Sequence, residues 1–592
     1  MTRPSTITQL FARSAAEFAD RPAVCDDDGH ALTYAELDRE SAALARRLVA
    51  DGVRREDRVG IHRERDVDLV VSILAALRAG AAYVAVDLRY PKARRELMLR
   101  AAGCRVTLVD AHEPPPLGDD IPTVGWNHDA PRTEPDGPVA RLPAPGPEDA
   151  GAVLFTSGST GTPKGVVVEH RNLVHFAMNP VLPQLVATDR VAQVANVSFD
   201  TFHYELWNSF AAGAEVVMMP SVPDLVRVDP GRALRRRRIS VLLAPTMAFN
   251  HIAVEDAEVF AGLRLLLTGG DVIRPAACRN VLASTFAGVL TNLYGPTEGT
   301  TAATSRDIAE VAGDDTSVPI GIGLAGVTLR VLDPSFSPVA TGEVGELYIG
   351  GTGVTRGYLG DPAKTAERFL PDPFGPPGAA MYATGDLVSM RPDGALNYLG
   401  RNDDQVKVRG YRVEPSEVER SLMACPDVLD ATVLPQGSDE DRRLVAFLVL
   451  ATGGTLPTVR EYAEERLPDY QVPAELVQVR EIPSTPHGKR DTAALLTGLA
   501  DRERGRGDRV PPRTDTERYL VRVWEELLGT EQISATDDFF TVGGNSMLAF
   551  RMSRRITRDR APELTLEAVL ENTVLADMAL IVDAATRKGA AV

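Results

Sequence analysis

The sequence has few cysteines, no long apolar run and no excess of basic residues. Its 592 residues include only four cysteines, which lie far apart with no CxxC pair. Such scattered thiols exclude a disulfide framework and a zinc site of the usual spacing. No segment approaches the roughly 18 apolar residues that span a membrane, and the N-terminus lacks the apolar stretch of a signal peptide. We therefore expect a cytoplasmic protein with no membrane contact.

The balance of charge is acidic. The chain has 64 Lys and Arg against 82 Asp and Glu, a formal net charge of -18 at pH 7. A nucleic-acid binder needs a basic face to neutralise phosphates, so we expect no nucleic acid among the partners. The hydrophobic share of 44% and the charged share of 25% are ordinary for a globular protein.

Helical and strand patterns alternate along most of the chain, which is typical of an α/β fold. At roughly 100–200 residues per domain, the length predicts three to five structural units. Residues 111–148 are rich in Pro, Gly and Asp and predict a long surface loop. We divide the chain into a large unit over 1–402, a smaller αβ lobe over 403–497, a linker over 498–513 and a helical bundle over 514–586.

The strongest local signal is the string FTSGSTGTPKG at residues 155–165. Its glycines let the backbone approach a phosphate, its hydroxyls donate hydrogen bonds, and Lys164 adds positive charge. The spacing differs from a Walker loop and from a G-x-S-x-G nucleophile elbow. The alternative is a flexible surface loop, but so ordered a string favours phosphate binding.

This loop resembles the phosphate loop of the adenylate-forming superfamily, which includes acyl-CoA synthetases, luciferases and the adenylation domains of nonribosomal peptide synthetases. Further motifs of that family follow in order between residues 10 and 495: LTYAEL (32–37), LRAGAAYV (77–84), NLYGPTE (292–298), GEL (345–347), RGYL (356–359), YATGDL (382–387), GRNDDQVK (400–407), LPDY (467–470) and HGK (487–489). The resemblance implies an α/β adenylation core of mixed sheets and helices over 1–402 and a small mobile α+β lobe over 403–497.

Two positions depart from the family pattern. Ala383 stands where Arg or Lys is common, and His487 stands where Asn is common. Neither change removes a catalytic group, so we expect an active enzyme.

The resemblance also implies roles for single residues. Adenylation brings a carboxylate to the α-phosphate of ATP while pyrophosphate leaves, so positive charge and a metal must offset the repulsion. Glu298 would hold Mg²⁺, Tyr294 would stack on adenine, and Asp386 would accept bonds from the ribose hydroxyls. The implied catalytic groups are Lys489, Glu298, Thr156 and Lys164. The implied nucleotide-binding groups are Ser157, Gly158, Thr160, Asn292, Tyr294, Thr297, Asp386 and Arg401.

Asp403 occupies the hinge position of the family. Rotation of the small lobe there would exchange two faces of the site between the half reactions. Lys489 would serve adenylation, and the turn at 408–410 would line the thioester-forming tunnel. The alternative for Asp403 is an ordinary turn-forming residue.

Asp200 matches the aspartate that pairs with the α-ammonium group in amino-acid-activating members. The resemblance places the side-chain pocket at Asp200, Thr201, Tyr204, Leu242, Leu267, Gly269, Leu293, Thr301 and Ala302. Beyond Asp200 and Lys489 no pocket position is charged, and an unpaired buried charge on the substrate would be costly. We therefore predict an amino acid with a neutral side chain, aliphatic or aromatic; a tyrosine-like substrate stays open.

The string DDFFTVGGNSM at residues 537–547 resembles the phosphopantetheine attachment site of peptidyl carrier domains. A helix that begins at Ser546 would favour a phosphate diester at its N-terminus; the alternative is a simple N-cap serine. The resemblance implies a four-helix carrier over 514–586, tethered by the flexible linker over 498–513. A phosphopantetheinyl transferase would attach 4′-phosphopantetheine to Ser546.

The expected carrier helix also has an unusual set of basic residues, namely Arg551, Arg554, Arg555, Arg558 and Arg560. This basic strip either meets an acidic face or is simply solvated, and composition does not decide between the two.

We therefore predict a ligase that forms aminoacyl-AMP from ATP and transfers the aminoacyl group to the pantetheine on Ser546, for a nonribosomal peptide or related antibiotic-type metabolite. An aryl- or acyl-acid ligase is the second hypothesis, and Asp200 argues against it. A non-catalytic carrier scaffold is the third, but Lys489, Glu298 and the phosphate loop are all present. With no condensation or thioesterase segment in the sequence, we expect either a free-standing loading or tailoring didomain or a subunit that docks in trans, in both cases serving a downstream or tailoring enzyme. An MbtH-like partner stays open.

Overall fold

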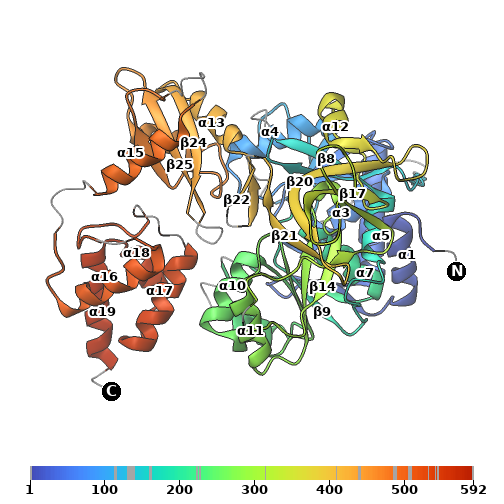
Figure 1. Cartoon of the computed structure of the whole chain (residues 1–592). Helices are drawn as coiled ribbons and strands as arrows, with labels where there is room; N and C mark the ends of the chain where they lie inside the picture. The colour runs from blue at the N-terminus through green and yellow to red at the C-terminus, as the bar shows by residue number, and fades with distance from the viewer. Residues whose placement is uncertain are drawn as a thin grey trace.

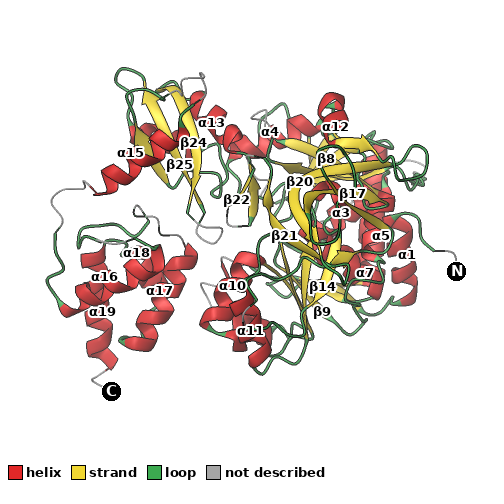
Figure 2. Ribbon diagram, viewed as in Figure 1, coloured by secondary structure: helices red, strands yellow, loops and turns green. Residues whose placement is uncertain are grey.

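The large N-terminal part contains three sheets whose strands are interleaved along the chain, and a small lobe and a helical bundle follow it (Figures 1 and 2). The α/β fold class is as expected. The computed structural model describes residues 3–112, 117–129, 141–158, 163–221, 224–225, 229–313, 315–403, 405–408, 410–437, 442–483, 490–504, 510–530, 533–540, 542, 544 and 546–589.

A seven-stranded sheet has the order β18-β8-β7-β4-β3-β5-β6. Its strands β3, β4 and β5 are parallel, whereas β7 and β8 form an antiparallel pair that flanks the phosphate loop. The strands are β3 (Arg58–Ile61), β4 (Ala82–Ala85), β5 (Val106–Val109), β6 (Thr123–Gly125), β7 (Ala150–Thr156), β8 (Lys164–Glu169) and β18 (Gly357–Tyr358).

A nine-stranded sheet has the order β15-β14-β13-β12-β11-β9-β10-β1-β2. In an open α/β sheet, ligands bind beyond the carboxyl ends of the parallel strands. That edge is formed here by the ends of β11, β12 and β13. The strands are β1 (Pro22–Cys25), β2 (Ala31–Thr33), β9 (Arg190–Gln193), β10 (Glu215–Met218), β11 (Val241–Pro245), β12 (Leu265–Gly269), β13 (Val289–Tyr294), β14 (Thr304–Asp307) and β15 (Ile322–Gly323).

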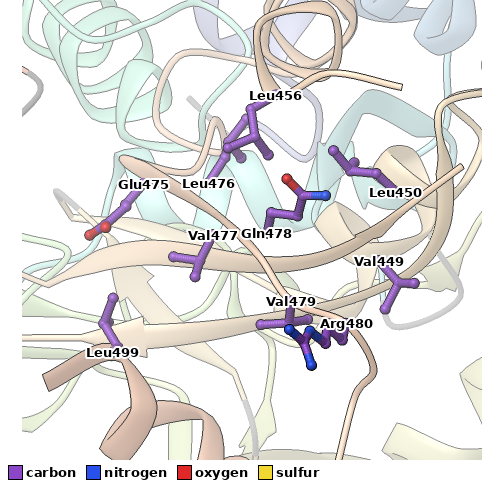
Figure 3. A pocket seen from close by; sticks show the side chains of 10 residues that line it. All are labelled: Val449, Leu450, Leu456, Glu475, Leu476, Val477, Gln478, Val479, Arg480 and Leu499. Atoms are coloured by element: carbon purple, nitrogen blue, oxygen red, sulfur yellow. The ribbon is translucent and has the colours of Figure 1, made fainter. Parts of the chain in front are cut away.

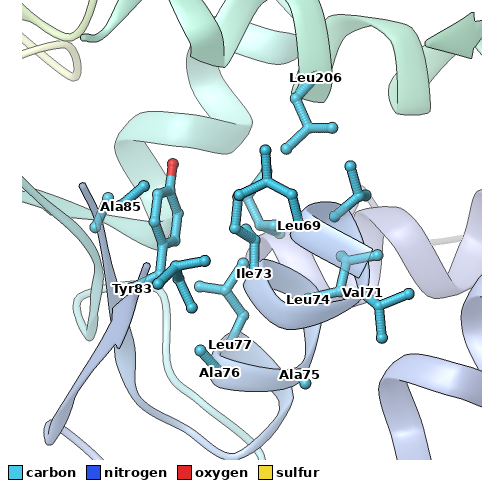
Figure 4. Close-up of a cluster of buried hydrophobic side chains, with 14 of the residues drawn as sticks. Leu69, Val71, Ile73, Leu74, Ala75, Ala76, Leu77, Tyr83, Ala85 and Leu206 are labelled. Carbon is cyan, nitrogen blue, oxygen red and sulfur yellow. The ribbon is translucent and has the colours of Figure 1, made fainter. Parts of the chain in front are cut away.

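Helix α3 (Val67–Arg78) lies between these two sheets, because it contacts β3 and β4 of one and β1 of the other. Only its last residue, Arg78, is not buried. Figure 4 shows its side chains packed among Tyr83 of β4 and Leu206. A helix that is apolar on all sides belongs in a core.

The remaining helices cover the sheets and their connections. They are α1 (Ile7–Glu17), α2 (Tyr34–Ala50), α4 (Lys92–Ala102), α5 (His170–Ala177), α6 (Thr201–His203), the π-helix η1 (Tyr204–Asn208), α7 (Ser209–Ala212), α9 (Pro230–Arg236), α10 (Thr246–Glu255), the 3₁₀ helix η2 (Ala257–Phe260), α11 (Pro275–Ala283), the 3₁₀ helix η3 (Thr297–Gly299) and α12 (Pro362–Arg368).

A five-stranded antiparallel sheet brings Asp386 on β20 beside Arg401 on β21. The hairpin of β22 (Val406–Val408) and β23 (Tyr411–Val413) follows it directly. The strands of this sheet are β16 (Val327–Leu332), β17 (Val344–Gly351), β19 (Phe369–Pro371), β20 (Ala380–Met390) and β21 (Leu396–Arg401).

The small lobe has a three-stranded sheet in the order β24-β25-β26. A groove of about 590 Å³ on this lobe is bordered by β26, Leu456 and Leu499. Figure 3 shows the side chains that line it. The elements are α13 (Pro415–Met423), β24 (Val428–Gln436), β25 (Arg443–Leu450), α14 (Leu456–Glu464), β26 (Glu475–Gln478) and α15 (Thr492–Arg504).

Two expectations about loops need correction. Helix α15 continues to Arg504, although composition predicts a linker from 498, because Leu499 packs with Val445 and Phe447 of β25. The predicted loop at 111–148 contains β6, which pairs with β5 and is held by the buried Trp126. In both places the charged or glycine-rich composition predicted a loop, although one buried apolar side chain holds the segment in regular structure.

The C-terminal segment is a four-helix bundle, as predicted. Trp524 and Phe539 pack edge to face in its core, with ring centroids 5.0 Å apart. Helix α17 begins at Ser546, also as predicted. The helices are α16 (Asp515–Leu528), α17 (Ser546–Asp559), α18 (Leu566–Glu571) and α19 (Leu575–Gly589). Across the described residues, no helix has both the length and the apolarity needed to cross a bilayer.

Candidate functional site

A cleft of about 160 Å³ opens at the carboxyl ends of β12 and β13. The loop after β7, the sheet that holds Asp386, and the β22–β23 hairpin complete its walls. It brings together nine of the predicted residues, namely Thr156, Ser157, Asp200, Asn292, Leu293, Tyr294, Thr297, Asp386 and Arg401.

One end of the cleft is organised around the Asp386 carboxylate. Tyr294 Oη donates a hydrogen bond to it, and so does Arg401 Nη1. Arg401 Nε also donates to Asp403 Oδ1 at 2.7 Å. Burial alone would raise the pKa of Asp403, but the bonds and charge of Arg401 outweigh it and hold that pKa below its usual value. These bonds hold the Asp386 carboxylate in place as a hydrogen-bond acceptor beside the ring of Tyr294.

Asp200 lies on the wall of the same cleft, partly exposed to it. Thr297 Oγ1 donates to its carboxylate at 2.7 Å, and Thr301 Oγ1 donates to its backbone carbonyl at 3.0 Å. Burial, with a contribution from the charge of Glu298, raises the pKa of Asp200 to about 6. Among the described residues, no cation hydrogen-bonds to this desolvated carboxylate, which is therefore suited to receive one from a ligand.

An apolar cluster extends from Leu293 on the cleft wall and contains four of the predicted pocket residues, Tyr204, Leu267, Leu293 and Ala302. Gly269 belongs at its edge, because a Cβ there would lie 2.5 Å from the carbonyl oxygen of Leu293. Leu242 does not join this cluster. Neighbouring residues of a strand face opposite sides, and Leu243 points to the cluster while Leu242 packs on the other face.

Thr201 is the first residue of α6, next to Asp200, and is half-buried. Asn292 is buried on β13, and its Nδ2 donates to the carbonyl oxygen of Pro319 at 3.0 Å. Asn292 lines the cleft, whereas Thr201 is only adjacent to Asp200 in sequence, and neither makes a contact that assigns a role.

Glu298 and Lys164 form a second, charged group behind the phosphate loop. Glu298 is fully buried; Tyr358 Oη donates to its Oε1 at 2.8 Å, and Arg412 Nη1 donates to its Oε2 at 3.2 Å. Burial alone would raise the pKa of Glu298, but Arg412 and Lys164 together lower it. Lys164 Nζ lies 3.5 Å from Glu414 Oε1 of the small lobe. Burial lowers the pKa of Lys164, and the charge of Arg412 adds to this.

The phosphate loop is described on both sides of residues 159–162, so Thr160 lies outside the described residues. Thr156 Oγ1 is buried and has no hydrogen-bond partner among the residues that the structure describes. Gly158 N donates to Glu417 Oε2 at 3.1 Å. A buried hydroxyl without a partner at the cleft fits a ligand with acceptor oxygens, such as a phosphate.

Comparison with known proteins decides what this site belongs to. A family model described as AMP-binding enzyme matches residues 11–359. The chain belongs to the AMP-binding enzyme family. The model of that family's C-terminal domain matches residues 417–489, and a model described as phosphopantetheine attachment site matches residues 518–582.

The relatives of this AMP-binding enzyme are peptide synthetases. It is 35% identical over 578 residues to tyrocidine synthase 3 of Brevibacillus parabrevis, covering 98% of this chain and 9% of the relative. It is 38% identical over 587 residues to phosphinothricin tripeptide synthetase PhsC of Streptomyces viridochromogenes, covering 98% of this chain and 53% of the relative. The chain thus spans about half or less of these relatives.

Solved structures with similar folds also combine adenylation and PCP domains. A holo NRPS protein that contains adenylation and PCP domains, bound to a vinylsulfonamide inhibitor, superposes with a TM-score of 0.83 at 26% identity, covering 98% of this chain and 97% of that one. An artificially fused adenylation–PCP di-domain from Klebsiella oxytoca has a TM-score of 0.72 at 26% identity, covering 80% of this chain and 94% of that one.

ATP and Mg²⁺ accompany this family, and the residues present fit both. Asp386 offers an acceptor for ribose, and Thr156 offers an unused donor for phosphate. Mg²⁺ is commonly held by one or two carboxylates together with substrate phosphates. Glu298 is such a carboxylate. The described residues contain no group of three or more potential ligands, so the nucleotide phosphates would have to complete the coordination.

Sequence reasoning missed the residues through which the small lobe of the AMP-binding enzyme reaches the cleft. Arg412 on β23 contacts Glu298, and its carbonyl accepts a bond from Ser157 Oγ at 2.8 Å. Arg94 Nη1 of the core also donates to Glu417 Oε1 of the lobe at 2.6 Å, and both side chains are buried. Arg412 lies five residues beyond the GRNDDQVK motif, so only its proximity to that motif could have indicated it.

The side chains of Lys489 and Ser546, two residues with central predicted roles, are not described by the structure. Lys489 lies outside the described residues, and its neighbour Arg490 forms ion pairs at 3.3 Å with Glu419 and Asp430 inside the small lobe. The backbone of Ser546 begins α17, and nothing is described of its side chain. The roles proposed for both rest on the sequence.

Replacing Arg412 with alanine should slow transfer to the carrier roughly tenfold while leaving adenylate formation nearly unchanged. The reason is that the Arg412 guanidinium donates to Glu298 when the β23 strand faces the cleft, and a hydrogen bond to a charged group contributes about 1.5–3 kcal/mol. Single-turnover loading and pyrophosphate exchange separate the two steps. Arg460→Ala, at a partly exposed arginine of α14, is the matched control. Equal losses in both assays would contradict this role.

Proposed function

We propose that this AMP-binding enzyme activates an amino acid with ATP and loads it onto its own carrier. In the first step a carboxylate oxygen of the amino acid bonds to the α-phosphorus, and the bond between that phosphorus and the bridging oxygen breaks to release pyrophosphate. In the second step the pantetheine thiol, having given up its proton, bonds to the acyl carbon, and AMP leaves. The placement of Asp200 on the cleft wall, in a chain that also has a phosphopantetheine attachment domain, is the observation that carries the proposal.

The chain's own residues would divide the work of the first step. Asp200 would bind the α-ammonium group and Asp386 the ribose hydroxyls. Thr156 and the residues after it would hold phosphate oxygens, with Lys164 as a nearby positive charge. Mg²⁺, held by Glu298 and the phosphates, would supply the charge that offsets repulsion between carboxylate and triphosphate. Lys489 would bridge the substrate carboxylate and the α-phosphate.

The arrangement of the small lobe supports a second orientation for the thioester step. Its β22–β23 hairpin, through Lys407 and Arg412, lines the cleft, whereas Arg490 next to Lys489 is engaged elsewhere in the lobe. Rotation at Asp403 would exchange the hairpin for Lys489 between the two steps. The boundaries at 402 and 513 remain our proposal for the units that move, and the small lobe ends with α15 at Arg504.

For the substrate we propose a neutral, medium to large side chain. The cluster around Tyr204 and Leu293 is apolar, and burying an unpaired charge there would be costly. Amino-acid-dependent pyrophosphate exchange over a panel of amino, aryl and fatty acids tests the proposal. Exchange with one or a few neutral amino acids is the expected result. Exchange with aryl or fatty acids and no amino acid would overturn it.

Lowering the pH below about 6 should raise the KM for the amino acid about tenfold per pH unit. The pKa of Asp200 is raised from 3.8 to about 6, so the carboxyl is ionised above that value and neutral below it. The substrate ammonium keeps its charge throughout this range. Exchange measured from pH 5 to 8 checks this, with the KM for ATP as the internal control. A flat amino-acid KM down to pH 5 would contradict the pairing.

The partners follow from the same proposal. A phosphopantetheinyl transferase must modify Ser546 before loading. The relatives carry segments like this one within longer synthetases, so a downstream or tailoring enzyme would receive the loaded amino acid. Whether an MbtH-like protein assists, and whether the protein works in the cytoplasm, stay predictions from the sequence.

A further inference from the structure

The arginines of the basic strip on α17 have two different surroundings. Arg555 Nη1 pairs with Glu526 of α16, inside the carrier bundle. Arg551 and Arg554 instead face the core, where α17 lies against α10 (Figure 1). The strip that composition left unassigned therefore has one part directed at another unit of the same chain.

Two ion pairs join α17 to the end of α10. Arg551 Nε lies 3.1 Å from Glu255 Oε1, and their side chains are 21% and 17% exposed. Arg554 Nη2 lies 3.5 Å from Asp256 Oδ2, with side chains 50% and 39% exposed. The first pair is largely covered and the second is at the rim, so the first should matter more.

The acidic pair stands at an electrostatically unusual position. Glu255 is the last residue of α10 and Asp256 is its C-cap, at the negative end of the helix dipole. Carboxylates are disfavoured there unless a cation is close. Asp256 has a local use, because it accepts a bond from Glu258 N at 3.2 Å at the start of η2. Glu255 is instead paired with Arg551 of the carrier.

An apolar strip accompanies the charges. Phe550 of α17 and Leu566 of α18 face Ile252 and Val259 of the core across a groove of about 280 Å³. Apolar contacts beside a charged rim are the usual make-up of an interface between separate units.

We infer that Glu255 and Asp256 form a docking corner for Arg551 and Arg554 of the chain's own carrier, and that this charge match sets the rate at which the carrier docks for loading. The inference rests on the proposed function. Helix α17 begins at Ser546, and at about 1.5 Å per residue the two arginines lie about 7–12 Å along its axis from that residue. Their pairing with the core therefore fixes the attachment end of the helix relative to the core.

A charge exchange in the full-length holo-protein tests the corner. Arg551→Glu alone and Glu255→Arg alone should each slow single-turnover loading roughly tenfold, because each places like charges together. The double variant should return to within about threefold of wild type. Arg518→Glu is the matched control, since it makes the same charge change on α16, where Arg518 pairs with Asp515 at 2.7 Å; it should load normally.

Pyrophosphate exchange and the mass of the pantetheinylated protein are measured on every variant. Exchange should be unchanged throughout, because α17 takes no part in adenylation. Salt at 0.5 M should slow loading by the wild type and not by Arg551→Glu, since screening shortens the reach of charges. Normal loading by both single variants, or a double variant as slow as either single one, would overturn the docking corner. Absence of amino-acid-dependent exchange in the wild type would instead overturn the proposed function.

Discussion

Ser546→Ala should abolish covalent loading of the amino acid while pyrophosphate exchange stays within about twofold of wild type. The change removes the hydroxyl that would hold phosphopantetheine, so no thiol is available as the acceptor. The cleft is formed without any residue of the bundle, and adenylate should therefore still form and be released by slow hydrolysis.

Intact-protein mass spectrometry after treatment with a transferase and coenzyme A measures this loss directly. Thr586→Ala, which removes an exposed hydroxyl on α19 of the same bundle, is the control and should be modified and loaded normally. Loading that survives in Ser546→Ala would show that the acceptor is another residue. Loss of exchange together with loading would show that the bundle supports adenylation, which we do not expect because no described residue of the bundle lines the cleft.

Asp200→Ala should reduce kcat/KM for the amino acid in pyrophosphate exchange by at least about 100-fold. An ammonium ion left in the cleft without its carboxylate loses a partly desolvated charge pair, and a loss of ~3 kcal/mol corresponds to that factor. Asp200→Asn should have nearly the same effect, because it keeps the acceptor for Thr297 and removes only the charge. Asp271→Asn removes a charge from the same cleft and serves as the control.

The substrate gives a second comparison for Asp200. The wild type should prefer the amino acid over its analogue without the α-amino group by a large factor, and Asp200→Ala should lose most of that preference. A variant that is merely unstable would lose activity with both substrates and keep their ratio. An unchanged ratio in Asp200→Ala would therefore contradict the assignment of Asp200 to the ammonium group.

Much of the site was predictable because its residues lie in contiguous motifs. The strings around Thr156, Tyr294, Asp386 and Arg401 each lie on a strand of the core, and the sheets bring these strands to one cleft. The start of α17 at Ser546 was predictable for the same local reason. These features depend on residues that are close together in the sequence, so they can be predicted without knowing how the elements pack.

What the sequence could not provide depends on contacts between units. Arg412 and the Arg94–Glu417 pair matter because the small lobe lies on the core, and neither belongs to a recognisable motif. The direction of Arg551 depends in the same way on where the bundle lies. Leu242 was assigned by resemblance, and the alternation of side chains along β11 turns it to the other face of the sheet.

The central claim is that one chain both adenylates an amino acid and accepts it on Ser546. The most direct test is the intact mass of the wild-type holo-protein after incubation with ATP, Mg²⁺ and each neutral amino acid in turn. We predict a mass increase of one amino acid minus one water with one or a few of these amino acids, dependent on ATP and absent from the apo-protein. A holo-protein that gains no mass with any amino acid, but gains an aryl or fatty acyl group with ATP, would contradict the account.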